Sequence, residues 1–172
     1  MLQNNNSYRV LELFFKFPRK DFQLRQVSRL TKIALPSTKK YLENLVKNKL
    51  ILENKETLYK SYDANIENKD FRLYKKISTL LKLKEFIEEL EEKINPDVII
   101  LYGSTSRGED MENSDIDIFV MGKEKSIDLE KFERELNRKI HLIFEDNIKN
   151  LSEEFLNNLI NGIILYGYLK VF

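Results

Sequence analysis

The spacing of apolar residues changes several times along this chain, and each change marks a predicted element. In the first third, apolar positions recur every three or four residues, which predicts three helices, over residues 8–17, 24–31 and 36–49. The apolar residues 50–52 then predict a strand, residues 54–56 a turn, and residues 57–62 the returning strand. We therefore expect a small N-terminal module over residues 1–66, made of three helices and a hairpin.

A longer stretch of helical spacing follows and predicts one helix from about residue 69 to residue 93, which Pro96 ends. We interpret residues 67–96 as a helix that links two modules, with one face packed against a sheet. A dimer seam is the alternative use of that face. The apolar residues predicted to face inward are Phe71, Tyr74, Ile77, Leu80, Leu81, Phe86, Ile87, Leu90 and Ile94.

Short apolar runs alternate with helical periods in the last part of the chain. The runs predict four strands, over residues 98–102, 115–120, 139–144 and 163–166. The helical periods predict two helices, over residues 128–137 and 151–160. Residues 97–172 are thus expected to form a small α/β sheet domain, and the whole chain belongs to the α+β class.

Charge divides the chain in the same way as the pattern does. Residues 1–60 hold 13 Lys or Arg and 5 Asp or Glu, a net charge of +8, whereas residues 61–172 hold 16 and 23, a net charge of −7. A basic front half is a candidate for nucleic-acid binding. Without cysteine, disulfides and thiolate metal sites are excluded. No apolar run is long enough to span a membrane and the start has no signal-peptide pattern, so we expect a cytoplasmic protein without a membrane partner.

The candidate chemistry lies in the segment VIILYGSTSRGEDMENSDIDIFV, residues 98–120. Asp115 and Asp117 are two residues apart at the start of a predicted strand, so their side chains point to the same face. Neighbouring carboxylates repel each other unless a cation lies between them, and Mg²⁺ is the usual ion. Gly103 permits a close approach of the backbone, and Ser104 offers a hydroxyl and a helix start to a phosphate. A plain turn followed by a solvated strand end is the alternative.

This segment resembles the minimal branch of the nucleotidyltransferase superfamily, whose pattern is Gly-Ser, a short loop with Arg-Gly, and then Ser-Asp-x-Asp. The resemblance implies that Asp115 and Asp117 are catalytic and hold Mg²⁺. It also implies a nucleoside triphosphate substrate, with ATP as the expected one. The residues it assigns to nucleotide binding are Gly103, Ser104, Arg107 and Ser114. For Arg107, an ion pair with Glu109 or Asp110 is the alternative.

The same resemblance implies transfer of a nucleoside monophosphate to an acceptor hydroxyl. A protein hydroxyl is the leading expectation, because minimal nucleotidyltransferases commonly act as antitoxins that modify a HEPN-type toxin. Antibiotic and nucleic-acid acceptors are the alternatives.

One position departs from the family pattern. The resemblance places a third carboxylate on the strand over residues 139–144, where this chain has His141, its only histidine. His141 can replace the carboxylate as a catalytic base, leave a site that binds nucleotide without turnover, or be a structural strand residue. Nearby acidic residues that can supply the missing carboxylate are Glu109, Asp110, Glu112, Glu145 and Asp146.

The N-terminal module resembles a winged helix-turn-helix domain, carried by the segment FQLRQVSRLTKIALPSTKKYLENLVKNKLI. The resemblance implies DNA binding through its third helix, with a protein-binding module as the alternative. Arg25, Arg29, Lys55 and Lys60 are expected to add backbone contacts. The side chains expected to contact DNA from the third helix are Ser37, Lys39, Lys40, Tyr41, Asn44 and Lys47.

Two functions from different classes therefore compete. The first is a nucleotidyltransferase tethered to DNA by its winged helix, and a homodimer is its expected oligomeric state. The second is a non-catalytic transcriptional regulator whose degenerate nucleotidyltransferase domain senses nucleotide. His141 and the charge division favour the second function, whereas the Gly-Ser and Asp-x-Asp pattern favours the first.

Overall fold

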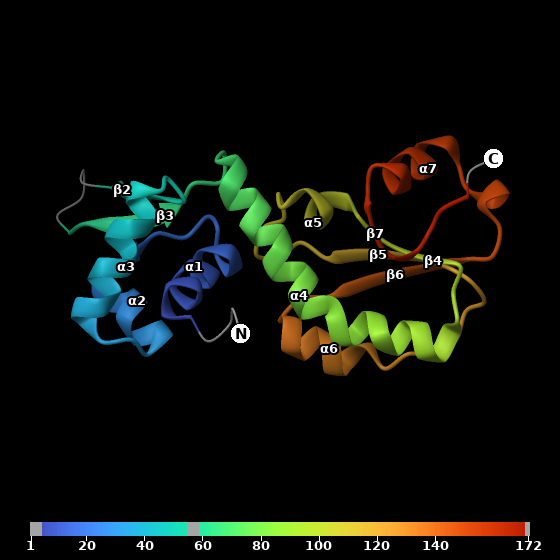
Figure 1. Cartoon of the computed structure of the whole chain (residues 1–172), viewed down its shortest axis with the longest axis horizontal. Coiled ribbons are helices and arrows are strands. Elements are labelled where there is room, and N and C mark those ends of the chain that lie inside the picture. The colour runs from blue at the N-terminus through green and yellow to red at the C-terminus, as the bar shows by residue number, and fades with distance from the viewer. Residues whose placement is uncertain (1–4, 55–58, 171–172) are drawn as a thin grey trace. The chain divides into compact units, whose positions relative to one another are not determined.

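Figure 1 shows the computed structural model, which describes residues 5–54 and 59–170. The described chain contains both helices and two β-sheets, as the α+β class predicts. It divides into two compact units, Met1–Lys75 and Lys76–Phe172. The boundary between the units falls inside the long helix α4, Lys69–Ile94. No helix within the described residues is long and apolar enough to cross a membrane.

The N-terminal unit packs three helices against a small antiparallel sheet. The helices are α1 (Asn6–Lys16), α2 (Leu24–Thr31) and α3 (Leu35–Lys47). The strands are β1 (Phe22–Gln23), β2 (Ile51–Asn54) and β3 (Ser61–Ala64), in the order β1-β3-β2. Their shared core buries Val10, Phe14, Val27, Leu42 and Ile51.

Most elements of this unit lie where the apolar spacing predicts them. The helix over Leu24–Thr31 has the predicted bounds, and α3 begins at Leu35, with Pro36 in its first turn. Strand β1 is not predicted, because two residues are too few to show a period. Strand β3 begins at Ser61, later than predicted. It is antiparallel to β2, so that Ala64 pairs with Ile51. The expected wing residue Lys55 and the predicted turn and strand residues 55–58 lie outside the described residues.

The buried face of α4 differs from the predicted stripe. Tyr74, Ile77 and Leu81 are exposed, at 46%, 38% and 42% of their surface, so predicting them inward is wrong. Leu83 is buried instead, and it begins a stripe at spacings of three and four residues that packs on the C-terminal sheet. The buried residues of this stripe are Leu83, Phe86, Ile87, Leu90 and Ile94.

The C-terminal unit contains one four-stranded sheet in the order β6-β5-β4-β7. Strands β5 and β6 are parallel, and the other neighbours are antiparallel. The strands are β4 (Val98–Tyr102), β5 (Ile116–Met121), β6 (Ile140–Glu145) and β7 (Ile163–Gly167). The helices between them are α5 (Gly103–Arg107), α6 (Leu129–Leu136), the 3-10 turn η2 (Ile148–Asn150) and α7 (Glu153–Ile160).

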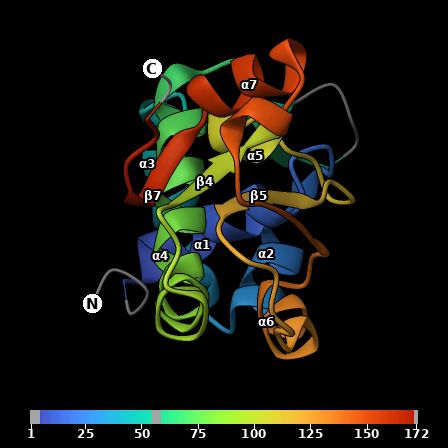
Figure 2. The ribbon, with the colours of Figure 1, turned by 90° about the vertical axis from the view of Figure 1, so that its right-hand side faces the viewer.

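Helices cover both faces of this sheet, as Figure 2 shows, with α7 on one side and α6 with part of α4 on the other. Strand β4 is therefore buried along its whole length, which explains its unbroken apolar run. Along β5, Ile116, Ile118 and Val120 face α4 and α6. The alternate residues Asp117 and Phe119 point to the α7 face. The strand period thus puts one carboxylate at the end of an otherwise apolar face.

Candidate active site

The site is built where β4 ends and β5 begins. Tyr102, the last residue of β4, pairs with Asp117 across the antiparallel ladder. Gly103 follows with φ +71°, and a Cβ atom added there would collide with Oδ2 of Asp117. Glycine is therefore needed at position 103 for both its backbone angle and the space it leaves. This close approach holds the carboxylate of Asp117 beside the turn between β4 and α5.

Asp115 and Asp117 supply two carboxylates at the start of β5. Asp115 is exposed and lies just before the strand, and the side chain of Asp117 is 25% exposed. Within residues 5–54 and 59–170, neither carboxylate forms an ion pair with a lysine or arginine. Two carboxylates that are two residues apart and have no lysine or arginine partner supply hard oxygen ligands, which a divalent cation prefers. The chemistry of Asp115 and Asp117 thus fits Mg²⁺.

His141 completes the edge of the site. The parallel register of β5 and β6 pairs it with Asp117, and its Nδ1 atom lies 3.3 Å from Oδ1 of that residue. The structure thus brings His141 beside Asp117, in the position where the resemblance implies a third carboxylate. In the part of the chain that the structure describes, no group of three or more His, Asp or Glu residues is arranged to hold a metal ion.

Several nearby carboxylates have other structural roles. Glu145 lies at the far end of β6, pairs in register with Met121, and accepts a hydrogen bond from Asn150 at 2.8 Å. That hydrogen bond lowers the pKa of Glu145. Glu109 pairs with Arg107, and Asp110 is buried against Arg138. Glu109, Asp110 and Glu145 are therefore engaged away from the carboxylate of Asp117.

The predicted nucleotide-binding residues surround the same turn. Ser104 is half-buried in α5, directly after Gly103. Arg107 is exposed, and its Nε atom lies 2.8 Å from Oε2 of Glu109, the ion pair that the sequence offered as an alternative. Ser114 accepts a hydrogen bond from the Met111 amide through its hydroxyl, at 2.9 Å. Their contacts with a nucleotide remain predictions.

The Tyr102 hydroxyl has an altered acidity that reflects its place beside the site. Burial of the ring raises the pKa of Tyr102 to about 12, and the negative charge of Asp117 contributes in the same direction. Tyr102 also packs edge-on against Phe155 of α7, with ring centroids 5.3 Å apart. The Tyr102 hydroxyl therefore ionises at a higher pH than an exposed tyrosine does.

Comparison with protein families agrees with this geometry. The family model described as polymerase beta, nucleotidyltransferase, matches residues 82–168, half of the chain. The chain belongs to this nucleotidyltransferase family. No match was found among curated proteins or among solved structures. The matched part contains the turn after β4, both aspartates and His141, which confirms the nucleotidyltransferase part of the sequence interpretation.

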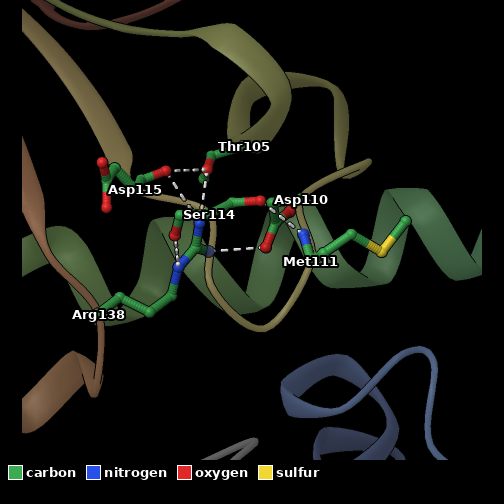
Figure 3. Close-up of polar contacts among 6 residues, drawn as sticks. All are labelled: Thr105, Asp110, Met111, Ser114, Asp115 and Arg138. Carbon is green, nitrogen blue, oxygen red and sulfur yellow. Dashed lines mark hydrogen bonds and ion pairs between the residues drawn. The ribbon is translucent and has the colours of Figure 1, made fainter.

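Arg138 is a polar residue of the nucleotidyltransferase domain that the sequence interpretation missed. It lies in the connection between α6 and β6 and reaches the loop before β5, as Figure 3 shows. Its partners Asp110 and Thr105 are 28 and 33 residues away in sequence. Only the fold brings these residues together, so no local pattern in the sequence marks Arg138.

The residues predicted to bind DNA lie outside the family match, on α3. Five of the six are exposed, namely Ser37, Lys39, Lys40, Asn44 and Lys47. Tyr41 is half-buried and packs against the N-terminal core. Lys39 lies 3.8 Å from Glu43 in an exposed ion pair. Lys40, Tyr41, Asn44 and Lys47 also line one open pocket. Their contact with DNA remains a prediction.

Proposed function

We propose that this protein is a Mg²⁺-dependent nucleotidyltransferase that transfers a nucleoside monophosphate from a nucleoside triphosphate to an acceptor hydroxyl. The observation that carries the proposal is the position of Gly103 against Asp117, with Asp115 two residues earlier. This arrangement lies within a chain segment that belongs to the nucleotidyltransferase family. ATP is the nucleotide we expect.

Asp115 and Asp117 are the residues that would hold the metal. Bound Mg²⁺ supplies charge neutralisation for the phosphate oxygens in this class of reaction. Gly103 and Ser104 lie at the turn beside it and are assigned to the triphosphate, with Ser114 in the loop before β5. Arg107 joins them if it exchanges its exposed partner Glu109 for a phosphate, an exchange of low cost because exposed ion pairs are weak.

The acceptor we propose is a hydroxyl of another protein. Its oxygen attacks the α-phosphorus of the nucleotide, the bond to pyrophosphate breaks, and the hydroxyl proton passes to a base. His141 is the candidate base, because its exposed ring lies beside Asp117. A HEPN-type toxin is the acceptor that an antitoxin-like role predicts, and antibiotics and nucleic acids are the alternatives.

The N-terminal unit is proposed to be a winged helix that binds DNA. Its three helices, its small antiparallel sheet and the exposed basic face of α3 support this assignment. Lys39, Lys40 and Lys47 would contact phosphates, whereas Asn44 and Ser37 can reach base edges. A homodimer is the oligomeric state that we propose.

A second function has one specific observation in its favour. Because His141 takes the place of a third carboxylate, the site lacks one of the oxygen ligands that the family pattern provides. Imidazole is a poor Mg²⁺ ligand, so such a site can retain nucleotide without turning it over. The chain is then a DNA-binding regulator that senses nucleotide.

Titration calorimetry with Mg²⁺ and ATP tests the proposed site. We expect binding by the wild type and its loss in Asp115→Asn/Asp117→Asn, with Glu88→Gln/Glu92→Gln on α4 as a control of equal charge change. Transfer of label from α-labelled ATP then separates the two functions. An enzyme labels an acceptor in a manner that depends on Asp117, whereas a sensor binds ATP and labels nothing. Absence of ATP binding by the wild type contradicts both.

A further inference from the structure

Arg138 donates four hydrogen bonds to residues beside the site. Its side chain is only 14% exposed, and all three guanidinium nitrogens donate hydrogen bonds. Nε donates to the carbonyl oxygen of Ser114 at 2.7 Å, and Nη1 to Oδ2 of Asp110 at 2.6 Å. Nη2 donates to the carbonyl oxygen of Asp115 at 2.9 Å and to the Thr105 hydroxyl at 3.1 Å. Figure 3 shows these contacts joining Arg138 to Thr105 of α5 and to the loop before β5.

These contacts fix the backbone on both sides of Asp115. Its carbonyl oxygen accepts hydrogen bonds from Arg138 and from the Thr105 hydroxyl, which lies 3.2 Å away. The next amide, that of Ile116, donates to the carbonyl oxygen of Lys139 at 2.9 Å. Residues 138 and 139 therefore hold the peptide groups before and after this aspartate, while its carboxylate points away from the guanidinium in Figure 3.

The charge of Arg138 is neutralised by a different carboxylate. Asp110 is 4% exposed and lies 2.6 Å from the guanidinium, closer than a typical exposed ion pair. The positive charge is therefore paired away from the carboxylates of Asp115 and Asp117, so it does not replace a metal ion there. The guanidinium can orient Asp115 through its backbone without cancelling its negative charge.

We propose that Arg138 is a positioning residue, which sets the carboxylate of Asp115 in the geometry needed to bind a divalent cation together with Asp117. This inference rests on the proposed function of that pair. Residues that orient metal ligands typically affect metal affinity by about 10- to 100-fold when replaced. We therefore expect a weakening in this range when the hydrogen bonds from Arg138 are removed.

The alternative is that the ion pair between Arg138 and Asp110 only stabilises the fold. Arg138 and Asp110 form a buried ion pair, and removing one partner leaves an unpaired buried charge, so Arg138→Met is at risk of not folding. The double variant Asp110→Leu/Arg138→Met removes both charges and avoids that problem. If the pair serves stability alone, this variant folds and binds metal normally, because Asp115 and Asp117 are unchanged.

The test is Mn²⁺ binding by the full chain, followed by electron paramagnetic resonance, with circular dichroism to show that each variant folds. We expect the folded double variant to bind Mn²⁺ about 10- to 100-fold more weakly than the wild type. Thr105→Val, which removes one hydrogen bond to Asp115, should weaken binding less. Arg134→Met, a neighbouring exposed arginine on α6, is the control that should bind as the wild type does.

The outcomes distinguish the inference from the function on which it rests. Wild-type affinity in the folded double variant overturns the positioning role and leaves the proposed metal site intact. No Mn²⁺ binding by the wild type overturns both. Weakened binding in the double variant, together with normal binding in Arg134→Met, supports the positioning role, because a purely stabilising ion pair does not change the affinity of a folded protein.

Discussion

The imidazole of His141 lies 3.3 Å from the carboxylate of Asp117, across two parallel strands. Register places the two residues opposite each other, and the strand period directs both to the α7 face. Any residue at position 141 therefore faces the proposed metal site. The side chain at this position decides how many oxygen ligands the site can offer.

Restoring a carboxylate at this position should strengthen metal binding. We expect His141→Asp to bind Mg²⁺ at least about tenfold more tightly, or about 1.4 kcal/mol, because it adds a hard oxygen ligand beside Asp117. Without metal, the variant should melt at a lower temperature than the wild type, since three carboxylates then repel each other. Calorimetric titration and thermal melts with and without Mg²⁺ measure both effects.

The matched control for this change is His141→Asn, which removes the imidazole without adding charge. Because it adds no charge, His141→Asn should not lower the metal-free melting temperature through repulsion. It should also bind Mg²⁺ no more tightly than the wild type does. Equal Mg²⁺ affinity in His141→Asp and His141→Asn would show that position 141 does not reach the bound ion.

Gly103 should tolerate no side chain. We expect Gly103→Ala to lower the free energy of unfolding by at least about 1–2 kcal/mol, because its φ of +71° disfavours a Cβ atom. The added methyl group also collides with Oδ2 of Asp117, so Mg²⁺ binding should be lost as well. Urea unfolding and calorimetry measure the two losses.

Gly122→Ala is the control for this substitution. The nearest atom to its added Cβ is Cγ2 of Ile94, at 3.3 Å, and its backbone does not require glycine. It should therefore retain Mg²⁺ binding. If Gly103→Ala keeps wild-type Mg²⁺ affinity, the approach between Gly103 and Asp117 does not shape the site.

The parts of the site that were predictable from sequence are those with local signals. The apolar run of β4 and the alternation at Asp115-Ile116-Asp117 locate two strands, and the glycine between them marks the turn. These signals depend only on residues close in sequence. They therefore predict strands β4 and β5 correctly and place the Gly-Ser and Asp-x-Asp pattern where β4 ends and β5 begins.

The remaining features depend on contacts between distant residues. Arg138 meets Asp110 from 28 positions away, so no spacing predicts that ion pair. The face of α4 was predicted in part wrongly, because helical spacing alone could not choose between Leu81 and Leu83 as the inward residue. Packing on the sheet decides that choice, and the pattern of one helix does not contain it.

The Tyr102 hydroxyl should titrate late. Its pKa is raised to about 12 by burial and by the charge of Asp117. The folded pKa of Tyr102 lies above the unfolded value of about 10, so its neutral hydroxyl contributes to the free energy of unfolding. This contribution is complete below pH 10 and is lost as the pH rises through 12. Tyrosinate absorbance should therefore lose one late-titrating group in Tyr102→Phe.

A companion variant tests the cause of this shift. Asp117→Asn removes the neighbouring charge and should lower the pKa of Tyr102, although burial will keep it above its usual value. Tyr168 is 71% exposed, so Tyr168→Phe provides the control that should leave the late-titrating group unchanged. An unchanged late titration in Tyr102→Phe would show that the absorbance belongs to another tyrosine.

The exposed lysines of α3 should account for the DNA binding that we propose for the N-terminal unit. We expect Lys39→Glu/Lys40→Glu to weaken binding to a mixed-sequence duplex and to reduce the slope of log affinity against log salt by about 2. Each phosphate contact contributes about 0.9 to that slope. Fluorescence anisotropy at several salt concentrations gives both values.

Lys123→Glu/Lys149→Glu changes the net charge equally on the C-terminal unit and should leave the slope unchanged. Equal losses in both pairs would indicate that net charge, rather than α3, determines affinity.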